Sequence, residues 1–144
     1  MADITISGID EVLELLDQAP KNIVMLGYGR AARAAMDVIG AAVVERTPIG
    51  TGDTAGNLVR ALFIDVTVDE NALGVDASVG FGGKQGHVAN EVEYGHVMVT
   101  HLPDKRVVGH VPAHPFMRPA FDASADQALD AFTTSLEATL KEIY

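Results

Sequence analysis

The chain has 144 residues, 48% of them hydrophobic, and no cysteine, which suits one compact domain over residues 1–144 and excludes disulfides, thiolate metal sites and cysteine nucleophiles. Twenty acidic against ten basic residues give a net charge of −10, so the chain is a poor candidate for gripping nucleic acid through its phosphates. No apolar run reaches the roughly 18 residues of a membrane-spanning helix, and the first ten residues lack the pattern of a signal peptide, so we expect synthesis in the cytoplasm and no membrane partner.

The first third of the chain predicts two helices after a short extended segment at residues 4–6. Apolar residues recur at helical spacing over residues 10–17 and again over residues 21–46. The second helix should end at Thr47-Pro48, because proline disfavours helix at the residue before it. A glycine-rich loop should follow, with Gly50, Gly52 and Gly56.

The middle of the chain predicts three strands. Residues 62–69 and 73–81 alternate apolar and polar side chains, which indicates strands with one buried face. Glu70-Asn71 suits a tight turn between them, so they should form an antiparallel hairpin. After a loop at residues 81–86, residues 88–94 alternate again and predict a third strand.

The last third predicts a projecting β-hairpin and a final helix. The hairpin covers residues 96–111, with its turn at residues 102–105. The helix should begin between Pro115 and Pro119, since proline is tolerated only in the first turn. Phe116 and Phe121 should anchor the helix on the sheet. These elements predict an α+β fold, with a long N-terminal helix and a C-terminal amphipathic helix packed on an antiparallel sheet.

One segment of the long helix also matches a nucleotide-binding pattern. Gly27-x-Gly29-x-x-Ala32 follows an apolar run, and Glu45 lies close to the expected distance downstream. This is the dinucleotide-binding fingerprint, which requires a strand, a turn and a helix. A small nucleotide-binding protein is therefore the alternative function. A continuous helix over residues 22–46 would count against it.

Other chemistry-bearing residues form weaker patterns. His101, His110 and His114 could converge in the hairpin and suit zinc, but their spacing matches no standard ligand pattern. Glu91 and Glu93 would share one strand face and could serve hydrolysis, although exposed charge is far commoner there. We predict no catalytic residue, no bound cofactor and no metal site.

Three motifs in order resemble one protein family. They are Glu45-Arg-Thr-Pro-Ile-Gly-Thr-Gly52, Val92-Glu-Tyr-Gly-His96 and Pro112-Ala-His-Pro-Phe-Met-Arg-Pro-Ala-Phe121. Their order and spacing resemble the head–tail joining and tail-completion proteins of long-tailed bacteriophages, also described as neck or minor tail proteins. The likeness runs from Gly8 to the C-terminus. The chain departs from the family in the longer loop at residues 53–57 and in the variable hairpin.

The resemblance implies a structural virion protein rather than an enzyme. Such proteins form a ring, commonly sixfold, between the head connector on the portal side and the tail tube or tail terminator. DNA passes through the lumen during genome ejection, and acidic walls would let it slide without specific binding. We expect contacts between subunits or with partner rings at a set of residues that flank the hairpin and the last helix: Glu93, Tyr94, His96, Lys105, Arg106 and Arg118.

Overall fold

A computed structural model of the chain describes residues 8–18, 21–69, 71, 74–101 and 103–143. The extended segment expected at residues 4–6 lies outside these ranges. In chain order the elements are α1 (Ile9–Gln18), α2 (Lys21–Arg46), the 3-10 turn η1 (Gly52–Thr54), α3 (Asn57–Arg60), β1 (Leu62–Asp69), β2 (Gly74–Phe81), α4 (Gly83–Tyr94), β3 (His96–Val99), β4 (Val107–Val111) and α5 (Met117–Ile143). No helix among the described residues is both long and apolar enough to cross a membrane.

The chain divides into two compact units, each built from separate stretches of sequence. Unit 1 comprises residues 1–41, 64–79 and 124–144, and unit 2 comprises residues 42–63 and 80–123. Unit 1 therefore holds α1 and most of α2, α5 and the β1–β2 pair. Unit 2 holds α3, α4, the β3–β4 pair and the first turns of α5. Each unit is described below by itself.

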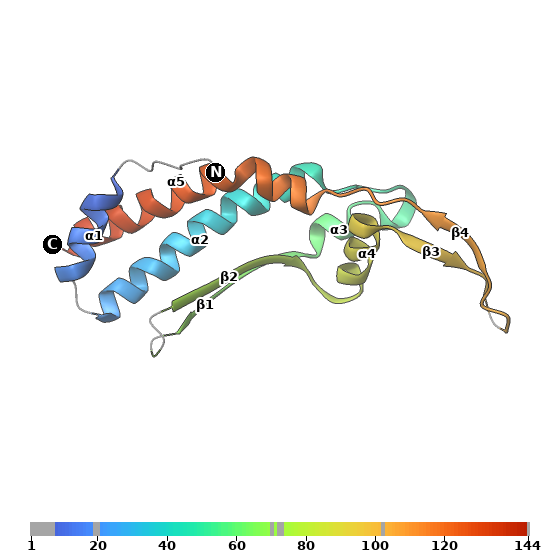
Figure 1. Ribbon diagram of the computed structural model, residues 1–144, viewed down its shortest axis with the longest axis horizontal. Coiled ribbons are helices and arrows are strands. Elements are labelled where there is room, and N and C mark those ends of the chain that lie inside the picture. Colours follow the sequence, from blue (N-terminus) through green and yellow to red (C-terminus); the bar gives the residue numbers. More distant parts are fainter. Residues whose placement is uncertain (1–7, 19–20, 70, 72–73, 102, 144) are drawn as a thin grey trace. The chain divides into compact units, whose positions relative to one another are not determined.

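Unit 1 is a helical layer with a β-hairpin, and its core forms where α1, α2 and α5 lie side by side (Figure 1). Val12, Ala31, Leu136 and Leu140 are buried there together. The rings of Tyr28 and Phe132 stack beside this cluster, with centroids 6.4 Å apart. Small residues on α2 opposite leucines on α5 let the two helix backbones approach closely.

The α2 helix runs without interruption from Lys21 to Arg46, as predicted. Gly27 and Gly29 therefore lie inside a helix, and the strand and turn of the dinucleotide fingerprint are not formed there. A Cβ atom on Gly27 would approach the Leu136 Cδ1 atom to 2.9 Å, and one on Gly29 would approach the Val68 Cγ2 atom to 3.1 Å. Both glycines thus serve close packing within unit 1.

The fold class is α+β, as the sequence predicted. The strands form two separate antiparallel pairs rather than one sheet, β1 with β2 and β3 with β4. The first two strands lie where alternation placed them, and the turn between them contains a hydrogen bond from the Asn71 amide to the Asp69 carboxylate at 2.9 Å. The predicted third strand at residues 88–94 is wrong, because this stretch belongs to helix α4.

The physical reason for that error is the spacing of the buried residues in α4. Ala89 and Glu93 are buried and lie four residues apart, which is the helical period, whereas Val88 remains exposed. His87 and Glu91 form a further pair at this spacing, with 3.1 Å between the imidazole Nε2 and the carboxylate. The alternation in the sequence arose because one of the buried side chains is a carboxylate, which was counted as exposed.

Gly95 combines a positive φ with close backbone contacts in unit 2. It ends α4 with φ 74° and ψ 169°, and an added Cβ atom would lie 2.6 Å from the Val111 carbonyl oxygen and 2.8 Å from the Ala113 nitrogen. This close approach is what allows the chain to leave α4 and begin β3 one residue later.

We predict that Gly95→Ala lowers the free energy of unfolding by about 3 kcal/mol or more, because it combines backbone strain with overlap of backbone atoms that cannot move aside. Gly50→Ala is the matched control, since Gly50 also has φ 74° but no atom lies near its Cβ position. The control should lose only about 1 kcal/mol. Urea denaturation followed by circular dichroism measures both, and equal losses would contradict the steric explanation.

Candidate functional site

The N-terminus of α5 is held by one carboxylate from α4. Glu93 accepts hydrogen bonds from the backbone N–H groups of Phe116 at 2.7 Å, Met117 at 3.0 Å and Arg118 at 3.0 Å. These donors have no partner within the helix, and the positive end of the helix dipole favours a negative charge there. Glu93 thus joins the second and third sequence motifs, and the Phe116 amide that it binds lies 23 residues further along the chain.

The environment of Glu93 keeps its carboxyl group ionised. Burial alone would raise its pKa, but the three backbone N–H donors and the positive charge of Arg118 outweigh that effect and hold the pKa below the ordinary value for glutamate. Only 8% of Glu93 is exposed. We predicted Glu93 as a residue that contacts a partner, and in this chain its carboxylate is buried and bonded to the start of α5.

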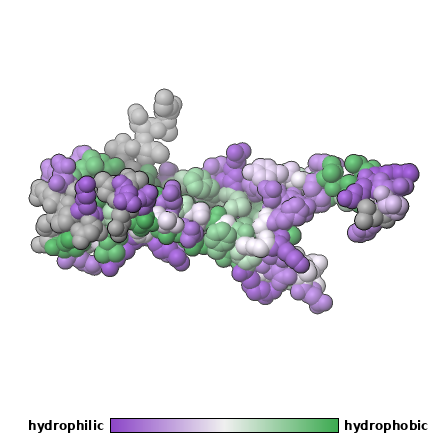
Figure 2. All heavy atoms as spheres, turned by 90° about the horizontal axis from the view of Figure 1, so that it is seen from below, coloured by the Kyte–Doolittle hydropathy of each residue, from purple (hydrophilic) through white to green (hydrophobic). Residues whose placement is uncertain are grey.

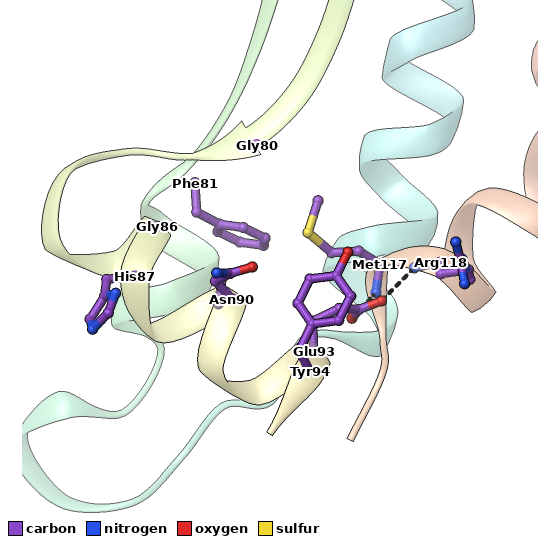
Figure 3. Close-up of a pocket in the computed structure, with 10 residues that line it drawn as sticks. Gly80, Phe81, Gly86, His87, Asn90, Glu93, Tyr94, Met117 and Arg118 are labelled. Carbon is purple, nitrogen blue, oxygen red and sulfur yellow. Dashed lines mark hydrogen bonds between the residues drawn. The ribbon is translucent and has the colours of Figure 1, made fainter. Parts of the chain in front are cut away.

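A cavity of about 410 Å³ opens beside this cap (Figure 3). Phe81 and Met117 form part of its apolar wall, and Tyr94 and Arg118 also line it. The Phe81 ring packs against Phe116 in turn, with centroids 5.7 Å apart. The Glu93 carboxylate that lines the cavity is already bonded to three N–H groups, whereas His87, which also lines it, lies with its Nε2 atom 3.1 Å from the Glu91 carboxylate.

The second feature of unit 2 is the hairpin of β3 and β4, which the sequence predicted over residues 96–111. His96 pairs with Val111, Val97 with His110, Met98 with Gly109 and Val99 with Val107, so Val108 is an extra residue in a bulge. Near the turn, the Thr100 amide donates to the Arg106 carbonyl oxygen and the Arg106 amide donates to the Thr100 hydroxyl oxygen, both at 2.9 Å.

The hairpin exposes apolar side chains on a scale unusual for two strands. Its exposed members are Val97 at 55%, Met98 at 44%, Val99 at 52%, Val107 at 66% and Val108 at 61%. Figure 2 shows hydrophobic residues gathered along this hairpin, with hydrophilic residues at its tip. Val97 and Val99 are two residues apart, and Val107 is the partner of Val99, so these three lie on one face. We call them the valine face.

Charge is divided sharply between the two units. Unit 1 contains 14 acidic and four basic residues, whereas unit 2 contains six of each. The whole net charge of −10 therefore belongs to unit 1, and unit 2 is neutral apart from its histidines, which are all five of the chain. A charge pattern of this kind separates a surface that repels polyanions from one that does not.

Four of the other residues predicted to contact partners, Tyr94, Lys105, Arg106 and Arg118, are exposed in unit 2. Tyr94 is 72% exposed, and Lys105 and Arg106 are exposed in the turn, where Arg106 pairs with Asp104 at 2.9 Å. Arg118 is exposed in the first turn of α5. His96 is half-buried, and its Nδ1 atom is buried without a hydrogen-bond partner among the described residues.

The structure also places the hairpin histidines and the two phenylalanines at the start of α5. Among the residues that the structure describes, no three His, Asp or Glu side chains lie close enough to hold a metal ion, so His101, His110 and His114 form no such site. Phe116 is buried and anchors the start of α5, as predicted, but Phe121 is 53% exposed and the prediction that it anchors the helix is wrong. Phe121 lies one residue after the fully buried Ala120, on a different side of the helix.

Sequence reasoning missed the valine face as a functional feature. The hairpin was predicted correctly, but interface residues were sought among its charged and aromatic side chains. The signal was present in the sequence: five valines and a methionine occur in two short strands, with no third strand and no helix predicted to cover them. An isolated pair of strands cannot bury both of its faces.

We predict that Glu93→Gln lowers the free energy of unfolding by about 2 kcal/mol at pH 7, because the bonds from N–H groups to a carboxylate weaken. Since the folded-state pKa is lowered, this contribution is present above the ordinary pKa of glutamate and is lost as the pH falls through the folded-state value. The difference in the free energy of unfolding between the wild type and the variant should therefore become smaller below about pH 4. Denaturation at several pH values measures this.

Glu91→Gln is the control, because Glu91 lies on the same helix with its side chain 37% exposed and paired only with His87. It should change stability by less than about 0.5 kcal/mol. A Glu93→Gln variant as stable as this control at pH 7 would show that the cap contributes little.

No protein-family model, no curated protein sequence and no solved structure matches this chain. The function is therefore inferred from the contacts, exposure and charges of the chain itself, together with the three motifs.

Proposed function

We propose that this chain is a structural protein of a tailed phage particle, forming a ring at the neck between the head connector and the tail tube or tail terminator. It acts through protein–protein contacts and carries out no catalysis. The ring is sixfold, and DNA passes through its lumen without specific binding. The valine face is the observation that carries the proposal, because its exposure in one copy of the chain is best explained by an assembly that covers it.

Apolar strands that are exposed to water carry a free-energy cost that assembly would remove. An uncovered edge or face of this kind is a site for association with other chains, and natural proteins protect such strands when association is not wanted. Here Val97, Val99 and Val107 are each more than half exposed. Covering them removes apolar surface from water, which stabilises the assembled state.

The segregation of charge supports the placement around DNA. Unit 1, with a net charge of −10, repels phosphate and suits a surface past which DNA slides. Unit 2 is neutral and suits contact with proteins. A ring needs both kinds of surface, one facing its lumen and the other facing its neighbours.

The contacts of the three motifs are consistent with the family resemblance. In the first motif, Thr47 ends α2 with its hydroxyl donating to the Val43 carbonyl oxygen at 2.6 Å. The second motif supplies the Glu93 cap and the turn at Gly95, and the third supplies the N–H groups that the cap binds. Each motif therefore has a structural role that depends on its residue types, which is what a shared fold requires.

Replacing the valine face should abolish assembly and leave the fold intact. In the triple variant Val97→Thr, Val99→Thr, Val107→Thr, threonine keeps the branched shape that strands favour while removing apolar surface. We expect a folded chain with a melting temperature close to that of the wild type and self-association weakened at least roughly tenfold. Mass photometry and size-exclusion chromatography measure association. Ile49→Thr, at an equally exposed position outside the hairpin, should associate like the wild type.

The placement at the neck is tested in particles. Deleting the gene from a phage that carries it should produce filled heads and free tails that do not join, and supplying the wild-type chain should restore joined particles. The triple threonine variant should not restore them. Particles that join normally without the chain would overturn the proposed function.

A further inference from the structure

We infer that the β3–β4 hairpin of one copy docks on helix α1 of the next copy, with the valine face covering Ile9 and Leu13 of that helix. This inference rests on the proposed function, since it names the two surfaces that would join neighbouring subunits of the ring. The two surfaces differ, so the contact is heterologous, and repeated contacts of this kind close into a ring when the rotation permits.

The α1 helix presents an apolar strip that is exposed among the residues described in unit 1. Val12 faces the core at 4% exposure, while Ile9 and Leu13 are 42% and 58% exposed. Ile9, Leu13 and Asp17 follow one another at four-residue spacing, so they share one side of the helix. An amphipathic helix that buries one side on its own core and exposes apolar residues on another is suited to a second contact.

The hairpin matches this strip in length and in kind. A ten-residue helix is about 15 Å long, and a five-residue strand such as β4 spans about 17 Å. Valines on a strand packed over an isoleucine and a leucine on a helix form the ordinary contact between a sheet and a helix in α+β proteins.

Charge favours α1 over the other exposed apolar positions, and it determines which end of α1 the hairpin turn meets. The helix carries Asp10, Glu11, Glu14 and Asp17, all exposed. None of the four forms a salt bridge in the described part of the chain, although Glu11 adds to the effect of Glu137 in raising the pKa of the Lys141 ammonium group. The hairpin turn carries Lys105 and Arg106 against one acid, Asp104. With the valines over Ile9 and Leu13, the basic turn reaches the Glu14 and Asp17 end. Ile49 belongs to the neutral unit 2 and offers no such complement. Leu26 belongs to unit 1, but the first turn of its helix α2 carries no acidic residue.

Disulfide trapping between copies tests the contact directly, because the chain has no cysteine of its own. Leu13→Cys copies are mixed with Val107→Cys copies under mild oxidation, so that a mixed dimer can form only between two molecules. The matched control replaces Val107→Cys with Ile49→Cys, since both positions are 66% exposed in unit 2. A second control replaces Leu13→Cys with Leu26→Cys, which is 51% exposed in unit 1.

We expect the Leu13 and Val107 pair to form mixed dimers at least roughly tenfold faster than either control. Equal rates would overturn the inference. Faster formation of Val107 homodimers would also overturn it, because the hairpins would then contact each other. A wild-type chain that assembles while this pair forms no dimer would sink the docking site and leave the proposed ring in place. If particles that lack the gene still join heads to tails normally, only the proposed function is overturned, and the disulfide result still decides whether the hairpin docks on α1.

Charge reversal provides an independent second test. One variant carries Lys105→Glu and Arg106→Glu, so its turn and its α1 are both acidic. The other carries Glu14→Lys and Asp17→Lys, so the hairpin turn and the C-terminal end of α1 that it meets are both basic, and lysine near the end of α1 suits the helix dipole. Each variant alone should associate roughly tenfold or more weakly than the wild type, because like charges meet, and an equimolar mixture should regain association. Association by either variant alone as strong as that of the wild type, or a mixture no stronger than its components, would overturn the contact.

Discussion

The buried carboxylate of Glu93 is the interaction on which unit 2 depends. It lies at the end of α4, two residues before Gly95 and three before the start of β3, and it binds the first N–H groups of α5. The His114 amide adds a bond to the Val92 carbonyl oxygen at 2.8 Å. These bonds close the base of the segment that contains the hairpin, so the chain leaves and returns at one fixed point. A charged cap is suited to this because its bonds are stronger than those of a neutral acceptor.

A closed base explains how two strands can persist without a third. An isolated hairpin is only marginally stable in water, but joining its ends in advance reduces the entropy that pairing must overcome. Gly95 and Glu93 therefore hold the hairpin, and the valines along it are free from that structural task. Side chains that are apolar, exposed and unnecessary to the fold of their own chain are best explained by contact with another molecule.

The sequence was sufficient for the parts of the fold that depend on local pattern. The periodicity of α2, the alternation in β1 and the prolines around the start of α5 each placed an element correctly. The sequence was insufficient where a charged side chain occupies a buried position. Glu93 is a charged residue in a core position, so a hydrophobic pattern read its helix as a strand and its side chain as exposed. Only the three N–H groups that surround it, contributed from a distant segment, reveal why a carboxylate is buried there.

The same limitation applied to the candidate interface. Charged and aromatic residues attract attention because they dominate the binding energy of many interfaces, and that reasoning selected Tyr94, Lys105, Arg106 and Arg118. These residues are accessible, but the larger exposed apolar area lies on the valines between them. Whether a valine in a strand is buried depends on what covers it, and the sequence indicated only that the strand exists.

The division of charge joins the two parts of the proposal physically. A uniform charge of −10 would make copies of this chain repel one another as strongly as they repel DNA. Placing all of that charge in unit 1 leaves unit 2 neutral. A hairpin from unit 2, which has a basic turn, therefore approaches an acidic neighbour without long-range repulsion. The acidity that keeps DNA from adhering is then also what attracts the hairpin. A single pattern of charge would thus favour contact between subunits and disfavour contact with the nucleic acid that passes them.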